Sequence, residues 1–133
     1  MIVADTNVMV YLLVRGQRAN EADAVYKKDS HWVAPSLWRS EFRNVLTLFV
    51  RQKSMGLDEA LEAMEKAEQL MMGQDFEVTT SSVLRLAASS GCSAYDCEFA
   101  ALAQALGVRL VTVDRMLLAK FKPLAISMSD FCS

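Results

Sequence analysis

The chain has 133 residues and a mass of 14.8 kDa, so we expect a single domain over residues 1–133. Hydrophobic residues make up 53% of the chain, which is enough apolar surface for a packed core and excludes an intrinsically disordered protein. Fourteen basic and sixteen acidic residues give a net charge of −2 at pH 7. This balance excludes a uniformly basic coat for nucleic acid but allows local basic patches.

We expect neither an export signal nor a membrane anchor. The longest early apolar run, Val8 to Val14, is far shorter than the ~20 residues that span a bilayer, and it lacks the basic start of a signal peptide. The three cysteines are odd in number and lack Cys-x-x-Cys spacing, so a reduced, cytoplasmic setting without a zinc site is expected. His31 is the only histidine, so a Ser-His-Asp or Cys-His mechanism would have to use it.

Short β-rich runs alternate with amphipathic helical stretches along the chain. The first expected strand is Ile2 to Ala4, followed by a helix that Asn7 caps and that ends at Val14. The later expected elements are a loop over 16–20, a helix over 21–28, a strand over 32–34, helices over 36–52 and 58–72, a strand over 76–78, helices over 81–90 and 93–106, a strand over 109–113, a helix over 115–122 and a strand over 124–126. This alternation predicts an α/β fold with a mainly parallel sheet covered by helices on both faces.

Two aspartates directly follow expected strands. Asp5 comes after the strand Ile2 to Ala4, and Asp114 comes after the strand over 109–113. Ligands of open parallel sheets bind at the carboxyl ends of the strands, so both aspartates are candidates for a functional site. The alternative is that each one caps the helix that follows it.

Glu41 lies on the apolar face of the long helix expected over 36–52. Residues three and four apart share a helical face, which places Glu41 in line with Leu37 and Val45. A carboxylate on such a face must be paired or bound to a metal, because burying it alone is costly. The alternative is a Glu at the edge of the apolar face that pairs with Arg39, Arg43 or another segment of the chain.

Asp96 repeats this pattern on the alanine-rich helix expected over 93–106, where it shares a face with Phe99 and Ala103. It also stands three residues after Ser93, which is the spacing of a capping box. Glu98 faces elsewhere, and we expect it to be solvated. Asp96 is therefore either a capping residue or a fourth acidic member of a site.

The four acidic residues Asp5, Glu41, Asp96 and Asp114 could converge on one site. Carboxylates gathered in this way repel one another and raise each other's pKa. Mg²⁺ or Mn²⁺ would relieve that repulsion, and neither ion needs histidine or cysteine as a ligand. A site of this kind suits metal-assisted hydrolysis of phosphodiester bonds.

Four segments in order carry a resemblance to a known family: residues 3–7 (VADTN), 40–46 (SEFRNVL), 95–103 (YDCEFAALA) and 110–114 (LVTVD). The chain resembles the PIN-domain ribonucleases, and more narrowly the VapC-type toxins of bacterial type II toxin–antitoxin pairs. The resemblance covers nearly the whole chain and rests on the order and spacing of these segments. It implies a three-layer α/β/α sandwich.

The resemblance also implies the activity. In that family the residues matching Asp5, Glu41, Asp96 and Asp114 bind Mg²⁺ or Mn²⁺ and cleave single-stranded or looped RNA. By the same resemblance, Thr6, Asn7 and Thr112 are polar supports that orient a carboxylate or a water. Some relatives carry a further aspartate where this chain has Met116, so a four-acid site is implied here. The implied partners are an RNA substrate, a cognate antitoxin protein and a second copy of the chain.

Substrate contacts are expected in the basic part of the chain. Residues 15–53 hold eight basic and four acidic residues, although the chain as a whole is net negative. Arg15, Arg39 and Arg43 are candidates for binding RNA phosphates. The alternative is an ordinary solvated helical surface.

Two other functions remain open on the sequence. One is a non-catalytic PIN-like module that binds RNA or protein. The other is a Mg²⁺-dependent phosphatase of haloacid-dehalogenase-like type with Asp5 as nucleophile, although Asn7 stands where that family has a second aspartate. Nucleotide-binding folds are disfavoured because the chain has no glycine-rich phosphate loop.

Overall fold

A computed structural model describes residues 1–133. Its centre is a five-stranded sheet in which every neighbouring pair of strands is parallel. The strands are β1 (Ile2–Ala4), β2 (Trp32–Pro35), β3 (Asp75–Phe76), β4 (Leu110–Val111) and β5 (Ala125–Ile126), and their order across the sheet is β3-β2-β1-β4-β5.

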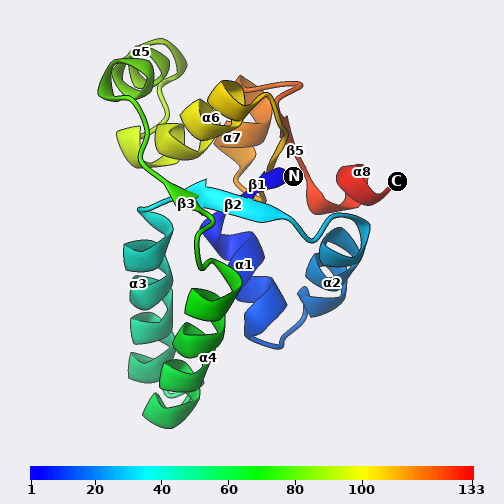
Figure 1. The fold of residues 1–133 in the computed structure, drawn as a ribbon. Coiled ribbons are helices and arrows are strands. Elements are labelled where there is room, and N and C mark those ends of the chain that lie inside the picture. Colours follow the sequence, from blue (N-terminus) through cyan, green and yellow to red (C-terminus); the bar gives the residue numbers. More distant parts are fainter.

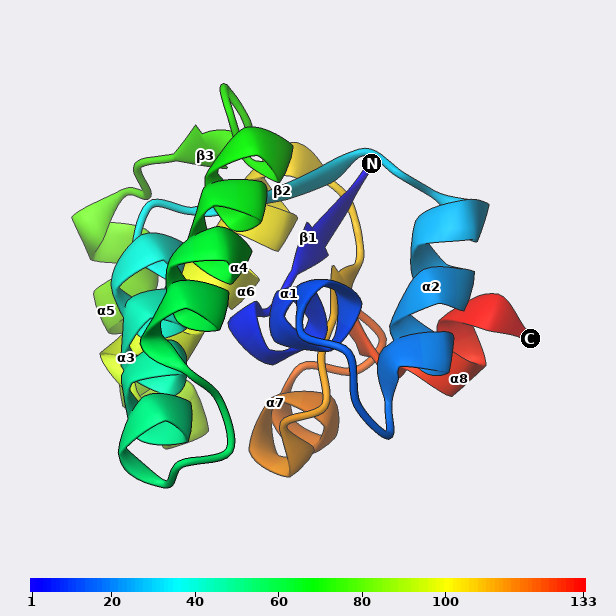
Figure 2. The same cartoon turned by 90° about the horizontal axis from the view of Figure 1, so that it is seen from below.

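Helices cover both faces of the sheet. They are α1 (Thr6–Leu13), α2 (Ala19–Lys28), α3 (Trp38–Arg51), α4 (Leu57–Leu70), α5 (Thr80–Ser90), α6 (Ala94–Leu106), α7 (Arg115–Lys120) and α8 (Met128–Cys132). Helices α1 to α4 lie on one face, α5 to α7 lie on the other, and α8 packs against α2 (Figures 1 and 2). The predicted three-layer α/β/α fold is therefore confirmed. None of the helices is both long and apolar enough to cross a bilayer.

The strand order reverses direction beside β1. The chain first adds β2 and β3 on one side of β1, then returns to add β4 and β5 on the other side. Parallel crossovers are right-handed, so this return puts the connecting helices on the opposite face. The segments that leave β1 and β4 consequently diverge, α1 to one layer and α7 to the other, and open a crevice at the carboxyl ends of these strands.

Several predicted boundaries were wrong. Asn7 does not cap the first helix, because Asp5 has an extended backbone and accepts a hydrogen bond from the Thr6 amide, so the helix begins at Thr6. Helix α2 begins at Ala19, inside the predicted loop over 16–20. Only Leu110 and Val111 of the strand predicted over 109–113 pair within the sheet. The terminal helix α8, capped by the Ser127 hydroxyl, was not predicted.

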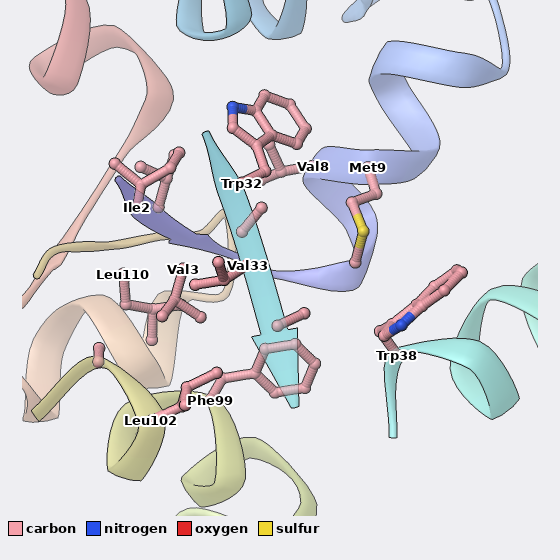
Figure 3. Close-up of a cluster of buried hydrophobic side chains, with 14 of the residues drawn as sticks. Ile2, Val3, Val8, Met9, Trp32, Val33, Trp38, Phe99, Leu102 and Leu110 are labelled. Carbon is pink, nitrogen blue, oxygen red and sulfur yellow. The ribbon is translucent and has the colours of Figure 1, made fainter. Parts of the chain in front are cut away.

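The core is built around the central strands. Every residue of β1, β2 and β4 is buried, as expected for strands covered on both faces. Helix α6 lies against β1, β2 and β4, and Phe99 extends from it toward the sheet (Figure 3). On the other face Trp38 packs edge-to-face on Phe42, with ring centroids 6.1 Å apart. These contacts place α3 and α6 on opposite faces of the sheet, and the first turn of each lies at the crevice.

Replacing Phe99 tests this core. Phe99 has no exposed surface, so Phe99→Ala should lower the free energy of unfolding by about 3–5 kcal/mol. Phe99→Leu, which fills more of the space, should lower it by less than about 1.5 kcal/mol. Leu84 is 60% exposed, and Leu84→Ala should change the free energy of unfolding by less than about 0.5 kcal/mol. Urea denaturation measures all three, and similar losses in Phe99→Ala and Leu84→Ala would contradict the packing described here.

Candidate active site

The four predicted acidic residues line one pocket of about 460 Å³ at the carboxyl ends of β1 and β4. They come from four places in the chain: the end of β1, the first turn of α3, the first turn of α6 and the segment after β4. The lining consists of the acids Asp5, Glu41, Asp96 and Asp114, the polar residues Thr6, Asn7 and Asn44, the apolar residues Val45 and Val113, and Arg115.

Asp5 is the most buried of the four acids, with 8% of its surface exposed. Its Oδ1 accepts a hydrogen bond from the Thr6 amide at 2.8 Å, and its Oδ2 accepts one from the Thr112 hydroxyl at 2.6 Å. Burial raises the pKa of Asp5 to about 6, and the nearby Asp96 and Asp114 carboxylates act in the same direction. The two hydrogen bonds lower the pKa but do not outweigh burial.

Thr112 links Asp5 to Asp114. The Thr112 side chain is fully buried, and its Oγ1 accepts a hydrogen bond from the Asp114 amide at 3.0 Å while donating to Asp5. The Asp114 carboxylate uses Oδ1 to accept from the Leu117 amide at 2.9 Å, which caps α7. Asp114 is thus held by its amide and by one oxygen, and its second carboxylate oxygen has no hydrogen-bond donor in the chain.

Glu41 is half-buried at the pocket wall. Its Oε1 accepts a hydrogen bond from the Thr6 hydroxyl at 2.7 Å. The alternative of an ion pair with a neighbouring arginine is not realised, because Arg39 pairs with Glu68 and Asp75 instead. Burial raises the pKa of Glu41, and the neighbouring carboxylates of the pocket raise it further.

Asp96 lies in the first turn of α6, and its amide donates to the Ser93 hydroxyl at 3.0 Å. Burial, followed by the charge of Asp114, raises the pKa of its carboxyl. Capping was the alternative explanation for three of the four acids. Asp5 and Asp114 do cap α1 and α7, but α6 is capped by Ser93, and the Asp96 carboxylate does not reach back to the Ser93 amide. Capping and pocket lining coexist because each cap occupies only one carboxylate oxygen or an amide.

No basic side chain forms an ion pair with these four carboxylates, so their mutual repulsion is uncompensated within the chain. No three of the chain's Asp, Glu, His and Cys side chains converge on a single coordination point, and an oxygen of Asp5 and one of Glu41 face threonine hydroxyls. An all-oxygen donor set around a pocket roomy enough for water fits Mg²⁺ or Mn²⁺, because such ions keep several waters and take few carboxylates directly.

The other predicted residues divide into two groups. Thr6 and Thr112 hydrogen-bond to pocket carboxylates, and Asn7 lines the pocket with its side chain exposed. The three basic candidates lie outside the pocket. Arg15 pairs with Asp23 at 2.7 Å, Arg39 pairs with Glu68 at 2.7 Å and stacks on Trp38, and Arg43 lines an apolar groove between α3 and α4. Their part in RNA binding stays a prediction.

Sequence analysis missed two pocket residues, Asn44 and Arg115. Asn44 is three residues after Glu41 on α3, so helical spacing alone could have placed it beside that acid. Arg115 directly follows Asp114, and its orientation depends on how α7 leaves the sheet. Glu98 was expected to be solvated, but it is half-buried near Glu77, and burial raises the pKa of its carboxyl.

The raised pKa of Asp5 predicts a pH-dependent stability. Between the ordinary value of 3.8 and the folded value of about 6, only the folded state holds the proton, so the unfolding free energy falls as the pH rises. The full loss above pH 6 is about 3 kcal/mol. In EDTA, Asp5→Asn should lack this pH-dependent loss of unfolding free energy. The variant should therefore be more stable than the wild-type chain at pH 7.5 but not at pH 4. Denaturation at both pH values measures this, and wild-type and variant profiles that stay parallel would contradict it.

The comparisons with known proteins agree with this architecture. Ribonuclease VapC3 of Pyrobaculum aerophilum is 25% identical over 126 residues, which cover 92% of this chain and 96% of that protein. PAE2754 from Pyrobaculum aerophilum, known from a crystal structure, is 26% identical in sequence. Its fold matches with a TM-score of 0.78, over 98% of this chain and 92% of that one. FitAcB from Neisseria gonorrhoeae shares the fold with a TM-score of 0.72 at 19% identity, over 97% of this chain and 99% of that one.

The family itself is given by a broader match. The sequence model of the PIN domain family matches residues 2–122, a span that contains all four acidic residues of the pocket. This match confirms the resemblance drawn from the four sequence segments, and it displaces the haloacid-dehalogenase-like alternative. The chain therefore belongs to the PIN domain family.

Proposed function

We propose that this protein is a metal-dependent endoribonuclease that hydrolyses phosphodiester bonds of RNA. The observation that carries the proposal is the meeting of four carboxylates from four segments in one pocket, with no basic side chain paired to any of them. The similarity to a protein named Ribonuclease VapC3 supports RNA as the substrate class. The non-catalytic alternative predicts RNA binding without cleavage.

Asp5, Glu41, Asp96 and Asp114 would hold Mg²⁺ or Mn²⁺ between them, in part through coordinated water. Bound there, the ion would lower the pKa of a coordinated water and offset charge on the phosphate. Thr6 and Thr112 restrain Glu41 and Asp5 by hydrogen bonds of 2.7 and 2.6 Å, so these carboxylates keep a defined orientation. Asn7 and Asn44 lie at the pocket wall, where their amides can bind water or substrate oxygens.

We also infer the partners that the resemblance implies, namely a cognate antitoxin protein that inhibits the nuclease and a second copy of this chain. Expression of the wild-type chain should arrest bacterial growth, and coexpression of the antitoxin from a neighbouring reading frame should relieve the arrest. A molar mass near 30 kDa by light scattering would support the homodimer, and a mass near 15 kDa would contradict it.

Cleavage assays test the proposed chemistry. RNA should be cut in Mg²⁺ or Mn²⁺ and remain intact in EDTA. Asp5→Asn and Asp96→Asn should each lower the cleavage rate by at least about 100-fold, because each removes a charged donor from the site. Asp58→Asn is the matched control, since Asp58 is exposed on α4 and lies outside the pocket. Cleavage that persists in EDTA, or in both pocket variants, would overturn the mechanism.

Metal binding can be measured without any RNA. A ligand that binds only the folded state at 100 times its Kd raises the unfolding free energy by about 2.7 kcal/mol. Saturating Mn²⁺ should therefore raise the Tm of the wild-type chain and of Asp58→Asn, and it should raise the Tm of Asp96→Asn much less. Equal metal-induced shifts in Asp58→Asn and Asp96→Asn would show that the ion binds elsewhere.

A further inference from the structure

Arg115 is the only positively charged residue that lines the acidic pocket. It is the first residue of α7 and directly follows Asp114. Its side chain is exposed, and it takes part in no ion pair and no side-chain hydrogen bond. A free guanidinium thus stands at the edge of a pocket whose other charges are all negative.

The backbone at Arg115 is held from both sides. The Asp114 amide donates to the Thr112 hydroxyl at 3.0 Å, and the Leu117 amide donates to the Asp114 carboxylate at 2.9 Å. Leu117 itself has no exposed surface, so it anchors α7 in the core. The base of the Arg115 side chain therefore has a fixed position relative to the pocket, while its guanidinium remains free to meet a ligand.

Arg115 does not act as an internal counter-ion of the acids. It has no nitrogen within 4.0 Å of a carboxylate oxygen, although Asp5, Glu41, Asp96 and Asp114 surround the same pocket. Arginines elsewhere in the chain do form such pairs, as Arg15 does with Asp23 and Arg39 with Glu68. Their guanidinium groups are already engaged by carboxylates, and that of Arg115 is not.

An RNA backbone that enters this pocket brings negative charge toward four carboxylates. A guanidinium can donate two parallel hydrogen bonds to the oxygens of one phosphate, which fixes both the position and the orientation of that phosphate. Asn44, also at the pocket wall, can donate hydrogen bonds but supplies no charge.

We propose that Arg115 binds a backbone phosphate of the RNA at the edge of the acidic pocket and so positions the neighbouring phosphodiester bond against the carboxylates. This inference rests on the proposed ribonuclease function. It makes Arg115 a substrate-binding residue, distinct from the candidates Arg15, Arg39 and Arg43 that the sequence offers.

The first test measures RNA binding without cleavage. In an Asp96→Asn background, a fluorescent single-stranded RNA is titrated at several salt concentrations. Adding Arg115→Gln should weaken binding about tenfold. It should also reduce the slope of log K against log salt by about 0.7, the value for one lost phosphate contact on a single strand. Arg115→Lys keeps the charge but loses the paired donors. Its affinity for RNA should therefore lie between that of the Asp96→Asn protein and that of the same protein with Arg115→Gln.

The matched control is Arg109→Gln. Arg109 is also exposed and free of ion pairs, but it precedes β4 and so lies at the opposite end of that strand. The Arg109→Gln substitution removes the same charge as Arg115→Gln. Added to the Asp96→Asn protein, it should leave both the RNA affinity and the salt slope unchanged within experimental scatter. Equal losses for Arg109→Gln and Arg115→Gln would overturn the proposal, because they would report only net charge.

The second test uses cleavage by the otherwise intact chain. A contact kept from the bound RNA through the transition state should raise the KM of Arg115→Gln about tenfold and leave kcat within about twofold. If the wild-type chain cleaves RNA and Arg115→Gln keeps its KM and salt slope, the role of Arg115 is wrong and the nuclease stands. If the wild-type chain neither binds nor cleaves RNA, the proposed function itself fails.

Discussion

The hydrogen bonds of the Thr112 hydroxyl tie together the two strand ends that carry Asp5 and Asp114. This single group donates to the Asp5 carboxylate and accepts from the Asp114 amide, so it joins the ends of two strands that are 107 residues apart in sequence. The join falls where the strand order reverses and where α1 and α7 leave for opposite layers. The Asp5 amide also donates to the Val111 carbonyl at 3.0 Å, so the Thr112 hydroxyl adds a side-chain link to a short backbone ladder between strands of three and two residues.

The same carboxylates serve the local fold and the pocket. Asp5 and Asp114 begin helices on opposite faces, and each gives one oxygen to a backbone amide of its own helix. Asp5 also takes the Thr112 hydroxyl, whereas Asp114 keeps an oxygen without a donor in the chain. Burial in a shared pocket raises the pKa of Asp5, Glu41 and Asp96. The fold therefore keeps mutually repelling carboxylates close together in one pocket, as is typical of a functional site.

Much of the fold and the acidic set could be predicted from the sequence. Asp5 was placed correctly because a buried apolar run immediately precedes it, and Glu41 because a carboxylate interrupts an apolar helical face. The exact caps were harder, since both Asp5 and Asn7 are good capping residues and only the backbone at Asp5 decides between them. Arg115 could not be placed, because its direction depends on the way a six-residue helix leaves the sheet.

The ion pairs of the arginines also bear on how fast a nucleic acid could reach this protein. Of the eight basic residues between positions 15 and 53, Arg15, Arg18 and Arg39 are each paired with a nearby carboxylate, which weakens the positive field of this segment. Long-range electrostatic steering accelerates encounters when one sign of charge covers a surface, so these ion pairs reduce its contribution here. Capture of an RNA would therefore depend more on short-range fit at the pocket than the count of basic residues suggests.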